Sequence, residues 1–197
     1  MSDALRRQLA FWPAAVIGTA LDLASKSLVF GWLRFDWAGR RPLGEHTVVE
    51  GFLALQPAAN SGTFFGQLGG HNTALIVFTV AMMALVVYMF LAPPREVLAG
   101  RRGAFYSAAL GLVLAGAAGN LWDRIWYGSV RDFLACSVHD WHWPTFNLAD
   151  TWLTLGIIAY LIATWRAARA GPPCSAQRAT QGGAEPPEPS GEEAPRP

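Results

Sequence analysis

The sequence predicts an all-α integral membrane protein with four transmembrane helices. Of its 197 residues, 52% are apolar and 15% are charged, whereas soluble domains carry about 25% charged residues. The mean hydropathy is +0.25, and four apolar runs approach the roughly 20 residues that a membrane helix needs. With a formal net charge of +1 and dispersed basic residues, the chain gives no indication of binding nucleic acid.

The first helix is predicted over residues 11–33. Arg6 and Arg7 precede it, and such a beginning is also found in cleaved signal peptides. The apolar run resumes beyond Asp22 and Lys26, however, and is too long for the apolar region of a signal peptide, so we expect the helix to be retained. Asp22 and Lys26 are four residues apart and share a helix face. Their simplest interpretation is an internal ion pair in which Lys26 snorkels to the interface.

Residues 34–71 form a polar segment between the first and second helices. Its apolar, β-branched stretch 47–55 is too short to span a membrane and predicts one or two short strands at the surface. Residues 60–66 contain an asparagine, two glycines and two phenylalanines. They suggest a tight turn with aromatic side chains in the interface, although an ordinary turn is the better interpretation of this stretch taken by itself. We expect a small extracytoplasmic cradle with β-structure here.

The other three helices are predicted at about residues 73–91, 103–122 and 147–165. Residues 73–91 carry no charge, and two prolines follow them, which end the helix because proline cannot continue the hydrogen-bond ladder. In the third helix small residues recur every four positions and provide a face for close helix packing. These residues are Ser107, Gly111, Ala115 and Gly119.

Basic residues in short loops mark the cytoplasmic side of a membrane protein. The predicted helices are flanked by Arg6 with Arg7, by Arg95 with Arg101 and Arg102, and by Arg166 with Arg169. Four helices with both termini in the cytoplasm place all of these on one side, although the longer opposite loop also carries arginines. Residues 1–170 would form the membrane domain, and residues 171–197, rich in Pro, Glu, Gly and Ala, a disordered cytoplasmic tail.

Polar residues converge at the outer ends of these helices. In this topology Asp132 follows the third helix, and Asp150 lies in the first turns of the fourth. Asp22 and Lys26 lie at a similar depth. Two carboxylates that lie close cannot both ionise easily, so one can act as a general base toward water while its protonated partner binds a carbonyl oxygen. Such a pair needs no metal and no covalent intermediate to hydrolyse a peptide bond.

Spacing alone leaves alternatives for these residues. Asn120, Arg124 and Asn147 are candidates for orienting the two carboxylates. Asp123 and Arg124 could instead form an ion pair at a helix end, and Asp150 could simply cap the fourth helix. Acidic side chains within a membrane also serve proton relays.

Other chemistry has weaker support in the sequence. Cys136, His139 and His142 have a loosely metal-like spacing, but flanking tryptophans indicate an interfacial loop. No Gly-x-Ser-x-Gly motif is present for a serine nucleophile. The two cysteines, Cys136 and Cys174, are too few for a disulfide framework and are expected on opposite sides of the membrane.

Several groups of residues between about positions 12 and 166 form an ordered set of motifs. They are Asp22 with Ser25 and Lys26, Asn60-x-Gly62-x-x-Phe65, Gly119-Asn120-x-x-Asp123-Arg124, Gly128-x-Val130-x-Asp132-Phe133, and Phe146-Asn147-x-Ala149-Asp150. With this set the chain resembles the bacterial lipoprotein signal peptidases, the signal peptidase II family.

The resemblance implies the roles of the site residues. Asp132 and Asp150 would be the catalytic aspartates. The supporting or substrate-binding residues around them would be Asn60, Gly62, Asn120, Arg124, Asn147, Asp22, Lys26 and Asp123. No metal or other cofactor is implied.

The resemblance also implies an activity and a location. The family consists of aspartic endopeptidases with four membrane helices and an extracytoplasmic cradle. They remove the signal peptide from prolipoproteins just before the diacylglyceryl-modified cysteine. We therefore expect a monomeric, multi-pass protein of the bacterial cytoplasmic (inner) membrane, with its site near the extracytoplasmic face. Its partners would be these prolipoproteins, membrane lipid and inhibitors of the globomycin type.

The chain departs from the family pattern in two places. Leu23 replaces a common glutamine, and Thr63-Phe64 replaces a common pair of alanines. The bulkier Phe64 is expected to narrow the substrate groove and to change the sensitivity to inhibitors. A small proton-coupled transporter or membrane scaffold is the alternative function. Transporters place polar groups along a path through the membrane, whereas residues 73–91 contain no ionisable side chain except Tyr88, which favours the peptidase.

Overall fold

The computed structural model describes residues 1–62, 72–98 and 100–169. Within this part, four helices are long and apolar enough to cross a membrane, which confirms the predicted number of membrane helices. They are α1 (Asp3–Trp32), α2 (Asn72–Leu91), α3 (Gly100–Tyr127) and α4 (Leu148–Arg169). Helices α1 and α3 extend beyond the predicted residues 11–33 and 103–122. Hydropathy identifies only the apolar part of a helix, and both helices continue through polar ends.

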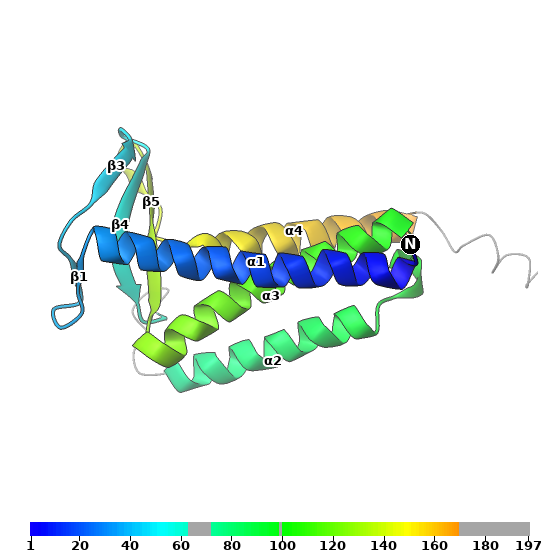
Figure 1. Ribbon diagram of the computed structural model, residues 1–197. Coiled ribbons are helices and arrows are strands. Elements are labelled where there is room, and N and C mark those ends of the chain that lie inside the picture. Colours follow the sequence, from blue (N-terminus) through cyan, green and yellow to red (C-terminus); the bar gives the residue numbers. More distant parts are fainter. Residues whose placement is uncertain (63–71, 99, 170–197) are drawn as a thin grey trace, which may run out of the picture.

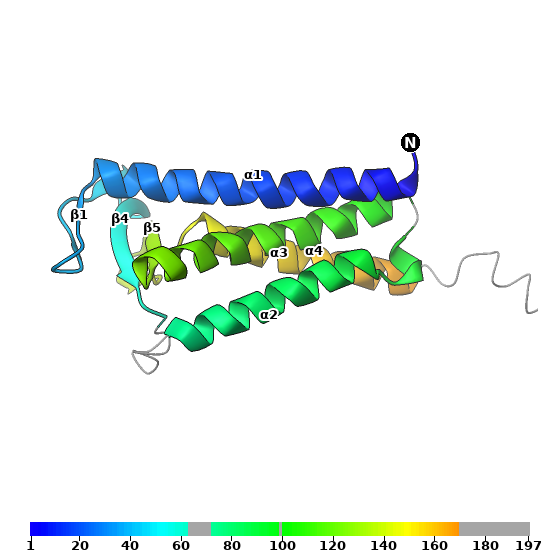
Figure 2. The same ribbon diagram turned by 60° about the horizontal axis from the view of Figure 1, so that its bottom comes forward.

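Helix α3 is the central helix of the bundle and contacts each of the other three (Figures 1 and 2). Its predicted small-residue face packs against α1. A Cβ atom built on Gly111 would lie 2.5 Å from the carbonyl oxygen of Phe11, and one built on Gly18 would lie 2.7 Å from Ala115 Cβ. The two helices therefore approach closely enough for buried polar groups on one to reach the other.

Two small sheets complete the described fold. One pairs β1 (Phe35–Asp36) with β2 (Arg41–Pro42). The other has the order β3-β4-β5-β6, with β3 (His46–Val49), β4 (Leu53–Asn60), β5 (Val130–Val138) and β6 (Trp141–His142). A short 3-10 helix, η1 (Arg95–Val97), follows α2.

The larger sheet corrects the predicted position of the β-structure. The cradle was expected to come from the segment between the first two helices, but β5 and β6 lie between α3 and α4. The predicted stretch 47–55 forms β3 and the beginning of β4, which are joined by a turn containing Gly51 with a φ of 70°. Glycine adopts this left-handed conformation more readily than other residues, because it has no Cβ atom.

The larger sheet lies at one end of the helix bundle, and the N-terminus and the end of α4 lie at the other (Figure 1). An apolar core of Val29, Phe30 and Phe133 joins the sheet to the end of α1. The sheet thus holds β5 against the helices at the end where the polar motifs were expected to meet. The predicted aromatic turn at Phe64 and Phe65, the 171–197 tail and Cys174 lie outside the described residues.

Candidate active site

Asp132 is held in β5 by its pairing with β4. The antiparallel register places Ala58 opposite Asp132 and Asn60 opposite Val130. Because side chains alternate along a strand, Asn60 and Asp132 lie on the same face as diagonal neighbours. Asn60 Nδ2 donates a 3.0 Å hydrogen bond to Asp132 Oδ2. The backbone N–H of Gly62 in turn donates to Asn60 Oδ1 at 3.0 Å, which fixes the orientation of the asparagine amide.

Asp150 lies in the first turn of α4 and forms a reciprocal cap with Asn147. The N–H of Asp150 donates to Asn147 Oδ1 at 3.0 Å, and the N–H of Asn147 donates to Asp150 Oδ2 at 3.2 Å. The predicted capping role is therefore correct, because these bonds satisfy donors that a helix start leaves free. The other carboxylate oxygen, Oδ1, accepts a 2.8 Å bond from Asn120 Nδ2 on α3.

Asn147 joins the two aspartates. Its buried side chain donates through Nδ2 to Asp132 Oδ1 at 2.6 Å and to Asn120 Oδ1 at 3.2 Å, while its Oδ1 caps Asp150. A single asparagine thus contacts both aspartates, which come from β5 and α4. The structure brings together Asn60, Asn120, Asn147, Asp132 and Asp150, as the sequence predicts.

Lys26 lies beside this network and is fully buried. Its Nζ is 2.7 Å from Asp22 Oδ2 and 3.2 Å from Asp123 Oδ2, and it donates to Asn120 Oδ1 at 3.0 Å. The predicted ion pair with Asp22 is confirmed, but the expected snorkelling of Lys26 to the interface is wrong. Two buried carboxylates and one buried amide oxygen surround the ammonium, so it has no need to reach water.

Asp123 does not pair with Arg124, contrary to one of the alternatives. Its Oδ1 accepts bonds from Arg131 Nε at 3.0 Å and Nη2 at 2.8 Å, and its Oδ2 accepts the backbone N–H of Arg131 at 3.0 Å. Arg124 Nη1 instead lies 3.4 Å from the carbonyl oxygen of Asn120. Neighbouring residues of a helix point in different directions, so Asp123 and Arg124 do not face each other. Arg131 is the site residue that the sequence analysis missed.

Burial and charge both act on Asp132, whose side chain is 1% exposed. Burial, followed by the nearby charge of Asp150, raises the pKa of Asp132 to about 7, although hydrogen bonds from Asn60 and Asn147 oppose the change. Burial disfavours the charged form of a carboxyl, and a second carboxylate acts in the same direction. Asp132 therefore keeps a proton at a pH at which an isolated aspartate loses it, while Asp150 is half-buried and reaches the surface.

The alternative metal ligands do not converge. Cys136 lies in β5, His142 lies in β6, and His139 lies between them with a left-handed φ of 54°. Among the described residues they do not belong to any group of three or more side chains of the metal-binding types.

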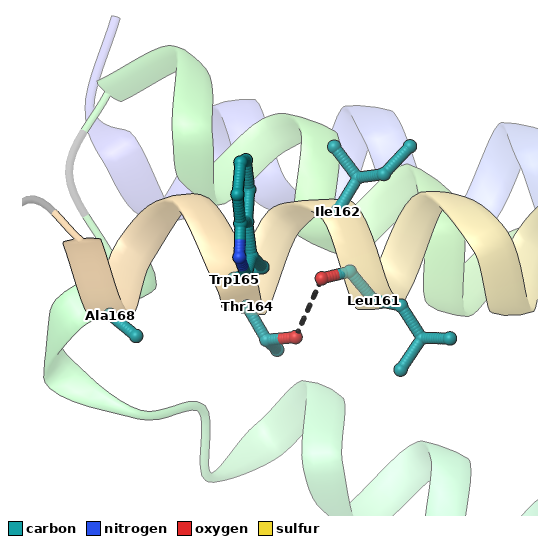
Figure 3. Close-up of a pocket in the computed structure, with 5 residues that line it drawn as sticks. All are labelled: Leu161, Ile162, Thr164, Trp165 and Ala168. Carbon is teal, nitrogen blue, oxygen red and sulfur yellow. Dashed lines mark hydrogen bonds between the residues drawn. The ribbon is translucent and has the colours of Figure 1, made fainter.

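A large groove lies at the opposite end of α4 from Asp150 (Figure 3). It has a volume of about 610 Å³ and is lined by Leu161, Ile162, Thr164, Trp165 and Ala168. The Thr164 hydroxyl donates to the carbonyl oxygen of Leu161 within the same helix. The mostly apolar lining suits contact with lipid chains, and none of the lining residues belongs to the aspartate network.

These features define a class of protein. The molecule is a four-helix membrane protein with two aspartates joined by one buried asparagine at the end of its bundle. Comparison then identifies the family: residues 14–166 match the family described as Signal peptidase (SPase) II, and the chain belongs to it. It is thus an aspartic endopeptidase of the signal peptidase II type, and the alternative of a transporter or scaffold is not retained.

Relatives and solved structures agree with this assignment. The chain is 30% identical to a lipoprotein signal peptidase of Rhodopirellula baltica, over 81% of this chain and 73% of the relative. It is 32% identical to one of Staphylococcus aureus, over 75% of this chain and 88% of the relative. A solved bacterial membrane enzyme superposes with a TM-score of 0.67 at 27% identity, covering 81% of this chain and 90% of that one.

Proposed function

We propose that the enzyme cleaves diacylglyceryl-modified prolipoproteins just before the lipidated cysteine, using water activated by Asp132 and Asp150. The family and the relatives named lipoprotein signal peptidase support prolipoproteins as the substrates. The catalytic role of the two aspartates is carried by one observation, which is that Asn147 binds both carboxylates: its side-chain Nδ2 donates to Asp132 and its backbone N–H donates to Asp150. Such a shared contact holds the two carboxyl groups in a fixed relation, as acid–base catalysis requires.

The two aspartates divide the work according to their surroundings. Asp132 is the more deeply buried and holds the proton. Asp150, which is half-buried, accepts a proton from water as the water attacks the scissile carbonyl carbon. The proton on Asp132 stabilises the developing oxyanion, and the proton taken by Asp150 passes to the leaving amine. Asn60 and Asn147 hold the Asp132 carboxyl throughout by donating one bond to each of its oxygens.

The orientation follows from the two ends of the bundle. The larger sheet lies at one end, and the N-terminus and the end of α4 lie at the other (Figure 1). Asp132 belongs to β5 of that sheet, and Asp150 lies in the first turn of α4. The arginine clusters near Arg6, Arg101 and Arg166 lie at the end with the N-terminus. They support a cytoplasmic position for that end of the bundle. We place the site at the extracytoplasmic face of the cytoplasmic membrane, with lipid around the helices. One chain supplies every residue of the network, which supports a monomeric enzyme. Inhibition by globomycin-type peptides is expected from the family alone.

Lipid dependence tests the proposed substrate. Purified enzyme in detergent is expected to cleave a prolipoprotein that carries its diacylglyceryl group and to leave the unmodified protein intact, with chelators having no effect on the rate. Mass spectrometry of the product locates the cut relative to the modified cysteine. Equal cleavage of modified and unmodified substrate would contradict lipid recognition, and a cut elsewhere would contradict the proposed site.

The pKa of Asp132 predicts the alkaline side of the pH profile. The active state carries one proton on the pair of aspartates, and Asp132 loses it as the pH rises through about 7. We therefore expect kcat/KM to fall above that pH with an apparent pKa near 7, because the doubly ionised pair lacks an acid. Initial rates across the pH range give the profile. A rate that stays constant well into the alkaline range would show that the protonated carboxyl is not needed.

A further inference from the structure

Four buried charged residues form a cluster beside the aspartates, which we call the charge cluster: Asp22, Lys26, Asp123 and Arg131. Its two carboxylates and two cations balance each other. Lys26 lies between Asp22 and Asp123, and Asp123 lies between Lys26 and Arg131. Buried charges require such pairing because an isolated charge away from water is costly.

Arg131 is held more firmly than an ordinary ion-pair partner. Asp123 binds both its side chain and its backbone N–H. Arg131 Nη1 lies 3.3 Å from the Ser27 hydroxyl of α1, and its guanidinium carbon lies 4.5 Å from the centre of the Tyr127 ring. Arg131 also pairs with Ala59 in β4. The first residues of β5 are therefore held by the neighbouring strand β4 and by helices α1 and α3.

Arg131 is linked to both aspartates without touching either carboxylate. It is the residue immediately before Asp132, and alternation along the strand turns the two side chains to opposite faces. The route to Asp150 passes from Asp123 through Lys26 to Asn120, whose Nδ2 donates to Asp150 Oδ1.

We propose that Arg131 is a positioning residue, which fixes the backbone of Asp132 through Asp123 and balances the charge next to the two aspartates. This inference rests on the proposed catalytic role of Asp132 and Asp150. Three further charged groups act on Asp132: Asp150 of α4, Lys26 of α1 and Arg124 of α3. Since all three remain in an Arg131 variant, a change in the pH profile reports the loss of Arg131 alone.

Charge rescue separates positioning from simple structural support. Arg131→Gln leaves the charge cluster with one excess negative charge, which disfavours ionisation of Asp132. The alkaline limb of kcat/KM is expected to move up by about half a pH unit or more. We expect kcat to fall about 10- to 100-fold, because Asp123 keeps only the backbone N–H of residue 131 and loses the two side-chain bonds that help to hold the strand beside Asp132. The double variant Asp123→Asn/Arg131→Gln leaves the charge cluster neutral. Its kcat/KM should therefore fall at the same pH as that of the wild type, even though its kcat stays low.

Two further variants complete the test. Arg131→Lys keeps the charge and loses the forked geometry, so it should keep the wild-type pH limb with a lower kcat. Arg41→Gln removes an arginine that is 72% exposed and serves as the matched control with wild-type behaviour. A wild-type pH limb in Arg131→Gln, or the same displaced limb in the double variant, would overturn the inference. If Arg131→Gln fails to fold, the test rests on Arg131→Lys. A shift in the pH at which kcat/KM of Arg131→Lys falls would then overturn the inference.

The same assays distinguish this inference from the proposed function. If Asp132→Asn and Asp150→Asn cleave the substrate normally, the catalytic pair itself is wrong. If both are inactive while Arg131→Gln keeps the wild-type kcat and pH limb, the catalytic pair stands and only the role of Arg131 fails.

Discussion

Replacing either Asp132 or Asp150 by asparagine is expected to lower kcat by at least about 10³-fold. Each substitution keeps the shape of the side chain but removes its ability to accept or donate the catalytic proton. The double variant should be no slower than either single variant, because one missing partner already disables the pair. Single-turnover cleavage of a lipidated prolipoprotein measures the loss without a contribution from product release.

The Asp132 variant needs a stability control. Asn60 and Asn147 each donate to one oxygen of Asp132, whereas an asparagine offers a single acceptor oxygen. One donor therefore loses its partner, at a cost of about 1–3 kcal/mol, and thermal unfolding in detergent must show that the protein remains folded. Asp140→Asn is the matched control, because Asp140 is an exposed aspartate in the turn before β6. Substantial cleavage by a folded Asp132 or Asp150 variant would exclude that residue from the chemistry.

The helices and the meeting of the aspartates follow from simple sequence signals. Long apolar runs predict membrane helices because every backbone polar group must be satisfied within the bilayer. Because successive membrane helices cross the bilayer in opposite directions, the end of the third helix and the beginning of the fourth lie on the same side. Asp132 and Asp150 must then lie in one region. Asn147 and Asp150 are three residues apart at the start of α4, so they share a helix face.

The strand that carries Asp132 was not predictable in the same way. Apolar and polar residues do not alternate regularly along β5, since the two successive polar residues Arg131 and Asp132 are both buried. Its pairing partner is β4, and the hydrogen-bonded pair of Asn60 and Asp132 is 72 residues apart in the chain. Local patterns carry no information about which distant segment completes a sheet, so the cradle was placed in one loop instead of two.

The error over Asp123 has a related cause. Arg124 is its neighbour in sequence, and Arg131 becomes its neighbour only when β5 folds back along the end of α3. The useful signal was an arginine in a largely apolar segment, which needs a buried acid because an unpaired cation is costly there. Asp123 was the acid available at the end of the preceding helix.

Lys26 shows how far this cluster departs from ordinary surface ion pairs. It is the only lysine of the chain, and both it and its two carboxylate partners are fully buried. Asp22 also accepts the backbone N–H of Ala149 at 2.8 Å, so α1 holds the first turn of α4 through this one carboxylate. Gly119 provides the space, because any Cβ there would collide with the Asp22 carboxylate. Asp22 and Lys26 therefore place the helix that carries Asp150.

Replacing Lys26 by methionine is expected to destabilise the protein by about 3–5 kcal/mol, because it leaves Asp22 as a buried charge without a cation. Asp123 suffers less, since Arg131 still neutralises it. SDS titration in mixed micelles, followed by tryptophan fluorescence, measures the change. Asp22→Asn/Lys26→Met is the matched control: it removes both charges and keeps an acceptor for Ala149, so it should recover much of the lost stability. If the single variant is no less stable than the double one, the unpaired Asp22 charge is not the cause, and Lys26 acts mainly through its bond to Asn120.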